Sequence, residues 1–263
     1  MNALYLTVRA LECLLGLSLL IQTLEFLRLQ TVQAPGALWA WSVQRGDVAH
    51  AGRPVRRLLD FLYRPDIHRI HLLVRLAAAA SLLWGSSPAS ALLLFASTLL
   101  ILIRWRGAFN GGSDFMSIVV LTGLLAAHLA SQWVEPVMAW KAGLWYIAIH
   151  AITSYFISGA IKWVTREWRD GSALVYFLDG GLHGPLPAAS RYRKRPIAIA
   201  CSWAFIVWEC LFPFALAGPR VAAVFCAVAA FFHFLVFRYF GLNRFFWAWL
   251  ASFPAIIWCA AQW

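Results

Sequence analysis

The chain has 263 residues, of which 62% are hydrophobic and only 13% are charged, and its formal net charge is +11. Soluble domains are closer to half apolar and a quarter charged, so this composition excludes an ordinary soluble protein and predicts an integral membrane protein in contact with the lipid bilayer. In a soluble chain the basic excess would suggest nucleic acid. Here Arg and Lys cluster between apolar stretches, as cytoplasmic loops and headgroup contacts require. We therefore expect no nucleic-acid partner.

The apolar stretches, taken in chain order, predict eight membrane spans, at about residues 4–27, 70–84, 89–103, 115–134, 143–164, 196–216, 221–240 and 245–263. A long basic connection covers residues 28–69. A second polar connection, residues 166–195, contains a predicted short surface helix. The expected fold class is all-α, a polytopic transmembrane bundle of about eight helices. Residues 1–263 then form a single domain, with no separate soluble domain.

The basic residues indicate the orientation of the spans. Of the 22 Lys and Arg residues, all but Arg9, Lys141 and Arg220 fall on the side of the odd-numbered connections. Cytoplasmic loops carry the excess of Lys and Arg. The asymmetry therefore predicts cytoplasmic basic loops and both termini outside.

Few ionisable residues lie within the predicted spans, and each has a structural explanation beside a functional one. Arg9, Arg75 and Arg238 are expected to extend toward the headgroups. His128 and His150 are expected to bond a backbone carbonyl or a helix neighbour. The five cysteines form no CxxC pair, and no Cys/His spacing indicates zinc, so no metal site is predicted.

Lys162 ends the stretch "YFISGAIK" in the fifth predicted span. The small residues Ser158 and Gly159 permit close approach of another helix. A lysine in a low-dielectric surrounding loses part of its preference for the charged form and can accept a proton. Glu209 and His233 are the candidate partners. Two alternatives stay open: Lys162 extends to the headgroups, or Glu209 pairs with an arginine only to hold helices together.

The segment "YFISGAIKWVTREWRDGSALVYFL" (residues 155–178) resembles the HTTM family, the membrane domain of vitamin K-dependent gamma-carboxylase and its bacterial relatives. Tyr155, Phe156, Gly159 and Lys162 match its helix motif, and the family's Trp-x-x-Gly follows at residues 168–171. The resemblance continues through "WECLFPF" at 208–214, the histidine of "FFH" at 233 and "LASFPAI" at 250–256. It extends over about residues 6–257.

This resemblance implies a membrane enzyme with a lysine base. In the carboxylase, the matching lysine is the proposed base that deprotonates vitamin K hydroquinone. By the resemblance Lys162 is a general base, Glu209 and His233 tune or orient it, and Tyr155 and Trp168 contribute to substrate binding. A quinone or quinol is the implied cofactor, in a lipid-accessible pocket, and the bacterial inner membrane is the implied location.

The chain also departs from the carboxylase. Its loop "FNGGSD" (residues 109–114) retains Asn110 but lacks the histidine that follows in the carboxylase. No large luminal domain is expected within residues 1–263, and the charge count places the lysine toward the cytoplasm rather than the lumen. We expect Asn110, Gly111, Gly112 and Asp114 to bind a polar group, partly through backbone N–H groups. The alternative is a turn capped by Ser113 or Asp114.

The sequence leaves two classes of function open. One is a carboxylase-like or quinol-dependent membrane enzyme. The other is a non-enzymatic maturation, immunity or assembly factor for a protein or peptide partner. A transporter is a third class, but the chain lacks the broken internal repeats typical of such proteins.

Overall fold

The computed structural model describes residues 3–33, 36–105 and 111–262 of the chain. All regular elements in these residues are helical, which confirms the predicted all-α class. Five helices are long and apolar enough to cross a membrane. They are α1 (Ala3–Arg28), extended by the 3-10 helix η1 (Leu29–Gln33), α5 (Pro88–Trp105), α6 (Gly111–Ala130), α7 (Pro136–Val164) and α11 (Pro219–Phe240).

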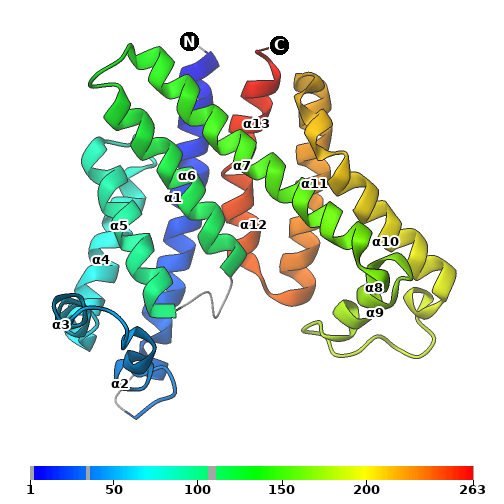
Figure 1. Cartoon of the computed structure of the whole chain (residues 1–263), viewed down its shortest axis with the longest axis horizontal. Coiled ribbons are helices and arrows are strands. Elements are labelled where there is room, and N and C mark those ends of the chain that lie inside the picture. Colours follow the sequence, from blue (N-terminus) through cyan, green and yellow to red (C-terminus); the bar gives the residue numbers. More distant parts are fainter. Residues whose placement is uncertain (1–2, 34–35, 106–110, 263) are drawn as a thin grey trace.

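The other three predicted spans coincide with shorter or interrupted helices. They are α4 (Pro65–Ser81), α10 (Arg195–Cys210) with the 3-10 helix η4 (Phe212–Ala217), and α12 (Asn243–Leu250) with α13 (Phe253–Ala260). Each of these α-helices is shorter than the ~20 residues that cross a bilayer as one straight helix. The count of eight spans therefore stays a prediction. Both termini lie at the same end of the bundle (Figure 1).

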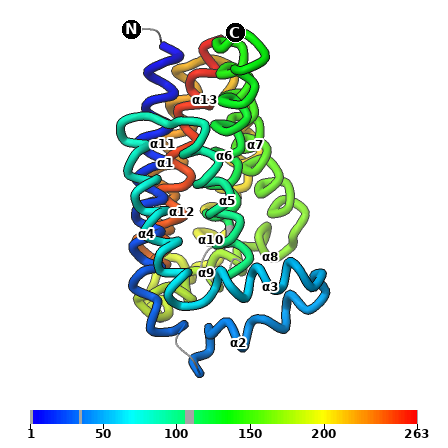
Figure 2. Tube along the Cα trace, turned by 90° about the vertical axis from the view of Figure 1, so that its left-hand side faces the viewer, coloured from blue at the N-terminus to red at the C-terminus, as the bar shows by residue number. Residues whose placement is uncertain are grey.

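The remaining helices lie at the opposite end of the bundle (Figures 1 and 2). They are α2 (Trp41–Gln44), η2 (Arg45–Val48), α3 (Arg53–Leu62), α8 (Arg166–Arg169), α9 (Ser172–Asp179) and η3 (Arg191–Arg193). Figure 2 shows α3 running across the bundle axis. Its exposed apolar side chains, Val55, Leu58 and Phe61, are separated around the helix from its three arginines. This separation is typical of a helix that lies in the membrane interface.

The bundle is built around α1 and α7. Helix α1 packs on α4, α12 and α13, whereas α7 packs on α6, α10 and α13. Helix α7 runs obliquely from the end with the termini to the end with α8 and α9 (Figure 1). This path carries the end of α7 to α10 and the α8–α9 connection.

Helices α6 and α7 meet through two glycines. A Cβ added at Gly143 would lie 2.7 Å from the backbone oxygen of Gly123, and one added at Gly123 would lie 2.6 Å from Cγ1 of Ile147. Because backbone atoms form part of this contact, a side chain cannot be accommodated by a rotamer change alone. Small residues of this kind are the usual means by which membrane helices pack closely.

Replacing Gly143 with valine should lower the free energy of unfolding by about 1–3 kcal/mol, because overpacking forces α6 and α7 apart. Thermal unfolding in detergent micelles measures the effect. Gly46→Ala is the control, since an added Cβ there meets no atom within 4 Å. Equal melting temperatures for the two variants would show that the contact does not constrain the helices.

Candidate functional site

Lys162 and Glu209 form a close ion pair between α7 and α10. The Nζ of Lys162 lies 2.6 Å from Oε2 and 2.9 Å from Oε1 of Glu209. The lysine side chain is 15% exposed and the glutamate side chain 4% exposed. The predicted partnership of these two residues is therefore formed, and Glu209 pairs with this lysine rather than with an arginine. Lys162 is therefore paired within the protein.

Ser158 completes a triangle with this pair. It lies one helical turn before Lys162, and its Oγ is 2.5 Å from Nζ of Lys162 and 3.2 Å from Oε1 of Glu209. The ammonium has only donors, so the serine oxygen accepts from Lys162 and its single hydrogen is donated to Glu209. Both ends of the ion pair are thereby held in a fixed orientation.

Gly159 brings the two helices together at this point. A Cβ added there would lie 2.7 Å from the backbone nitrogen of Cys210 and 2.8 Å from Cβ of Glu209. The small residue in the motif thus has a steric purpose. It allows α10 to approach α7 closely enough for Glu209 to contact the lysine one turn further on.

Trp168 covers the lysine from the connection after α7. Its ring centroid is 5.2 Å from Nζ of Lys162, a cation–π distance. Its carbonyl accepts a hydrogen bond from Ser202 of α10. Gly171, with φ of 80°, packs against Ala198, where a Cβ would lie 2.7 Å from the carbonyl carbon. The Trp-x-x-Gly spacing therefore fixes the connection on α10 and places the indole over the lysine.

The start of α9 is stabilised locally. Hydrogen bonds from the side chain and backbone of Ser172 lower the pKa of the Asp170 carboxyl. Phe177 of α9 stacks on Trp168, with ring centroids 5.6 Å apart. This contact supports the indole from α9.

Tyr155 and His233 form a second buried pair. The phenol oxygen of Tyr155 lies 2.6 Å from Nε2 of His233, and both residues are at most 3% exposed. Phe212 stacks on Tyr155 at 3.9 Å, and Trp249 stacks on His233 at 5.1 Å. Nδ1 of His233 has no hydrogen-bond partner among the described residues. An aromatic enclosure therefore surrounds this pair.

The structure does not place His233 next to Lys162. Tyr155, its partner, precedes Lys162 by two helical turns on α7, about 10 Å along the axis. Trp208, next to Glu209 in the chain, contacts the ring of Tyr155 at 5.4 Å and lies between the two pairs. A direct contact of His233 with Lys162 was expected, and among the described contacts it is absent. His233 instead bonds Tyr155.

Residues 110–114 were expected to form a polar loop, and those that the structure describes lie in a helix instead. Asn110 lies outside the described residues. Gly111 begins α6, so Gly112 and Asp114 belong to the first turn of that helix rather than to an open loop. A Cβ on Gly112 would lie 2.6 Å from the ring of Phe245. Asp114 is 2% exposed and accepts a 2.6 Å hydrogen bond from Gln22. Neither residue contacts Lys162.

Arg75 corrects an expectation. We expected it to extend to the headgroups, yet it is fully buried and bonds Gln22, Thr23 and Thr98 at 2.6, 3.1 and 2.8 Å. Gln22 in turn reaches Asp114, so the arginine and the aspartate belong to one polar cluster. The cluster joins α1, α4, α5 and α6.

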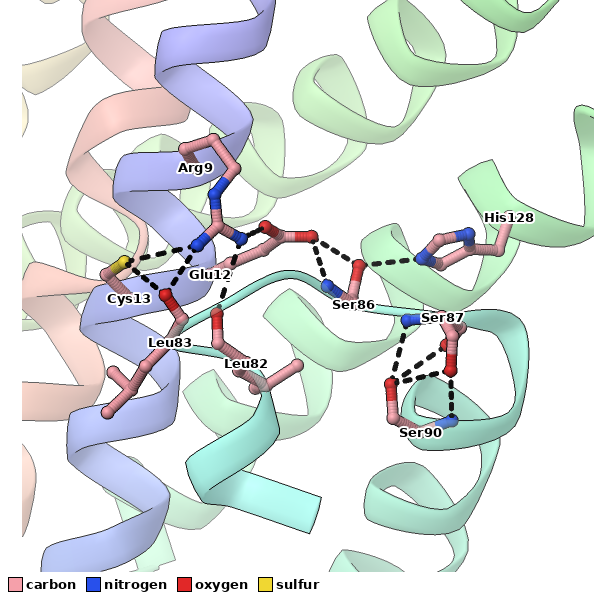
Figure 3. A network of polar contacts seen from close by, with 9 residues as sticks. All are labelled: Arg9, Glu12, Cys13, Leu82, Leu83, Ser86, Ser87, Ser90 and His128. Atoms are coloured by element: carbon pink, nitrogen blue, oxygen red, sulfur yellow. Dashed lines mark hydrogen bonds and ion pairs between the residues drawn. The ribbon is translucent and has the colours of Figure 1, made fainter.

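Arg9 also binds inside the protein. It forms an ion pair with Glu12 and donates to the carbonyls of Leu82 and Leu83 at 3.3 and 2.7 Å (Figure 3). These carbonyls follow the last residue of α4 and lie outside its backbone hydrogen-bond pattern. Backbone groups that lie in apolar surroundings need such partners. Arg9 therefore secures the turn between α4 and α5.

The other side of this turn is bound by Glu12 and His128 (Figure 3). Glu12 accepts from the backbone nitrogen of Ser86 at 2.9 Å and also from its hydroxyl. The single hydroxyl hydrogen is then committed, so Nε2 of His128, 2.7 Å away, is the donor to Ser86. His128 was expected to bond a backbone carbonyl or a neighbouring helix, and it bonds the α4–α5 turn. His150 does bond a carbonyl, that of Tyr146, at 2.8 Å.

No group of three or more His, Cys, Asp or Glu side chains suited to a metal ion occurs in the described parts of the chain. Comparison with known proteins adds no relative. No family model matches the chain, and no curated protein or solved structure matches it either. The site is therefore interpreted from its own geometry.

Replacing Lys162 with methionine should lower the free energy of unfolding by about 3 kcal/mol, because Glu209 is left as a buried charge without its cation. Adding Glu209→Leu should recover most of that loss, since the double variant buries no unpaired charge. Denaturant unfolding in micelles measures the free energy of unfolding of Lys162→Met, of Glu209→Leu and of the double variant. Lys141→Met on the exposed part of the same helix is the matched control. If the double variant is as unstable as the two single losses added together, the two residues are not coupled.

Proposed function

We propose that the chain is an HTTM-like membrane protein in which Lys162 is a general base for a lipid-accessible acidic substrate of the quinol class. The observation that carries the proposal is the pair of Lys162 with Glu209. A lysine amine and a carboxylate are held within 2.6 Å of each other at the end of an apolar helix. Ionisable residues at such positions are often functional. The sequence resemblance adds the expectation of a lysine base.

The geometry suits proton capture once the ion pair has released one proton. The neutral amine of Lys162 then takes a proton from an acidic O–H group, and the ammonium that forms lies again against the Glu209 carboxylate and the oxygen of Ser158. Opposite charge and hydrogen bonding both stabilise that product. Trp168 adds the face of its ring. Glu209 and Ser158 thus stabilise and orient the base, whereas Tyr155 and His233 form a separate hydrogen-bonded pair further along α7.

Exposed apolar side chains next to Lys162 support a quinol as the substrate class. Ile161, Trp163 and Val164, the residues on either side of it, are 58%, 49% and 74% exposed, so the chain presents apolar surface around a partly exposed amine. Two cavities in the described part of the chain, of about 350 and 360 Å³, are lined by other residues. The proposed approach of the substrate is from the lipid side, where these exposed apolar residues lie. When bound, a quinol supplies the acidic hydroxyl and the redox chemistry that the side chains lack.

Mass spectrometry of lipid-soluble molecules that co-purify in mild detergent tests the proposal. Wild type and Lys141→Met should carry a quinone-class molecule, and Lys162→Met should carry about tenfold less, the loss expected for about 1.4 kcal/mol of binding free energy. A wild-type protein without any such molecule would contradict the proposal. If the wild type instead retains a stoichiometric protein or peptide, the non-enzymatic maturation, immunity or assembly role is favoured.

For the topology, we propose eight crossings of the bacterial inner membrane with both termini outside. Both termini lie at one end of the bundle, and the basic connections lie at the opposite end. This arrangement supports an even number of crossings. In this arrangement α4, α10 with η4, and α12 with α13 complete the set of spans. Lys162 would then lie toward the cytoplasmic face.

Cysteine labelling in intact cells checks this topology. In a variant without the five native cysteines, a membrane-impermeant thiol reagent should label Gln132→Cys, in the exposed turn between α6 and α7. It should not label Ala188→Cys, in the exposed connection after α9. Labelling of both positions from the outside would show that α7 does not separate them across the membrane, and it would contradict the proposed topology.

A further inference from the structure

A second site, independent of Lys162, lies at the end of the bundle away from the termini. A cavity of about 350 Å³ opens where the end of α1 meets the turn between α11 and α12. This volume is within the range of small-ligand sites. The lining residues that carry the argument are Glu25, Arg28, Leu29, Leu242, Asn243 and Arg244.

Arg244 is a buried arginine, and one of its nitrogens has no hydrogen-bond acceptor in the described part of the chain. It is 6% exposed, its Nε lies 3.1 Å from Oε2 of Glu25, and its guanidinium lies 5.0 Å from the ring centroid of Phe26. Its Nη1 has no hydrogen-bond partner among the described residues. A buried donor without an acceptor is energetically unfavourable. Arg244 is therefore a residue of the cavity lining that has an unsatisfied hydrogen-bond donor.

The positive and negative charges around the cavity also do not balance. Arg28, the last residue of α1, is exposed and has no hydrogen bond or ion pair with the described residues. Glu25 offsets only one of the two arginines, and it also accepts from Asn243. Deeper in the bundle, Asp114 and Arg75 add one charge of each sign. One positive charge is left over.

We propose that this cavity binds the phosphodiester headgroup of an anionic phospholipid. A phosphodiester carries a single negative charge, which matches the excess, and its oxygens suit the planar donor groups of arginine. Leu29 and Leu242 supply apolar walls, which suit an amphiphile better than a free phosphate. The cavity also lies at the end of the bundle with the basic connections, where anionic lipid headgroups are attracted. A soluble phosphate ester shares the chemistry, and the experiment separates the two sources.

Delipidated protein in neutral detergent is titrated with phosphatidylglycerol and, separately, with glycerol phosphate, and binding is followed by native mass spectrometry. Arg28→Gln should weaken binding about tenfold, because it removes one charge-assisted contact. Arg28→Lys should restore part of it. Arg220→Gln is the matched control, since Arg220 is an exposed arginine near the start of α11, whereas the cavity adjoins the end of that helix. Arg28 is exposed and unpaired, so its replacement should not impair folding, and equal melting temperatures verify this.

Phosphatidylglycerol binding that depends on Arg28, without comparable glycerol phosphate binding, establishes a lipid-headgroup site. Arg28-dependent binding of glycerol phosphate with equal affinity overturns the lipid assignment in favour of a soluble phosphate ester. Equal binding of each ligand to wild type, Arg28→Gln and Arg220→Gln overturns the site altogether. None of these results depends on whether a quinone binds near Lys162.

Discussion

A charge that lies among apolar helices needs a partner supplied by the protein, because lipid and packed side chains offer neither water nor counterions. This constraint determines where the helices of the bundle meet. Lys162 finds Glu209 across the α7–α10 contact, and Arg9 finds Glu12 and the carbonyls that follow α4. Arg75 finds neutral oxygens from two other helices, α1 and α5. Each polar contact fixes which faces of the apolar helices can pack together.

The small residues are the steric counterpart of these contacts. Ion pairs require separations under 4 Å between atoms on different helices, and bulky residues in between would prevent them. Gly159 supplies the space at the Lys162–Glu209 pair, and Gly171 lets the following connection lie on α10. The segment that carries the resemblance therefore has a coherent physical explanation. Its glycines permit close contact, its lysine forms the ion pair, and Trp168 covers the lysine.

Much of this arrangement could be predicted from the sequence, and the exceptions have identifiable causes. Long apolar stretches predict helices directly, so the all-α class followed from composition. Glu209 could be chosen as a partner for Lys162 because acidic residues are scarce in the apolar segments. Arg75 was misjudged because its partners are hydroxyl and amide groups, which carry no charge and occur widely in membrane helices. The bond of His233 to Tyr155 was missed for a related reason: a tyrosine in an apolar run is indistinguishable from a packing residue.

The central claim is that Glu209 responds to chemistry at Lys162. Infrared difference spectroscopy of the purified protein, with the bands of Glu209 identified from Glu209→Gln, tests it most directly. The account predicts a carboxylate band that is altered by Lys162→Met and that changes when a quinol is added to the wild type. A Glu209 band that is the same in wild type and Lys162→Met, and that is unaffected by the quinol, would contradict the account.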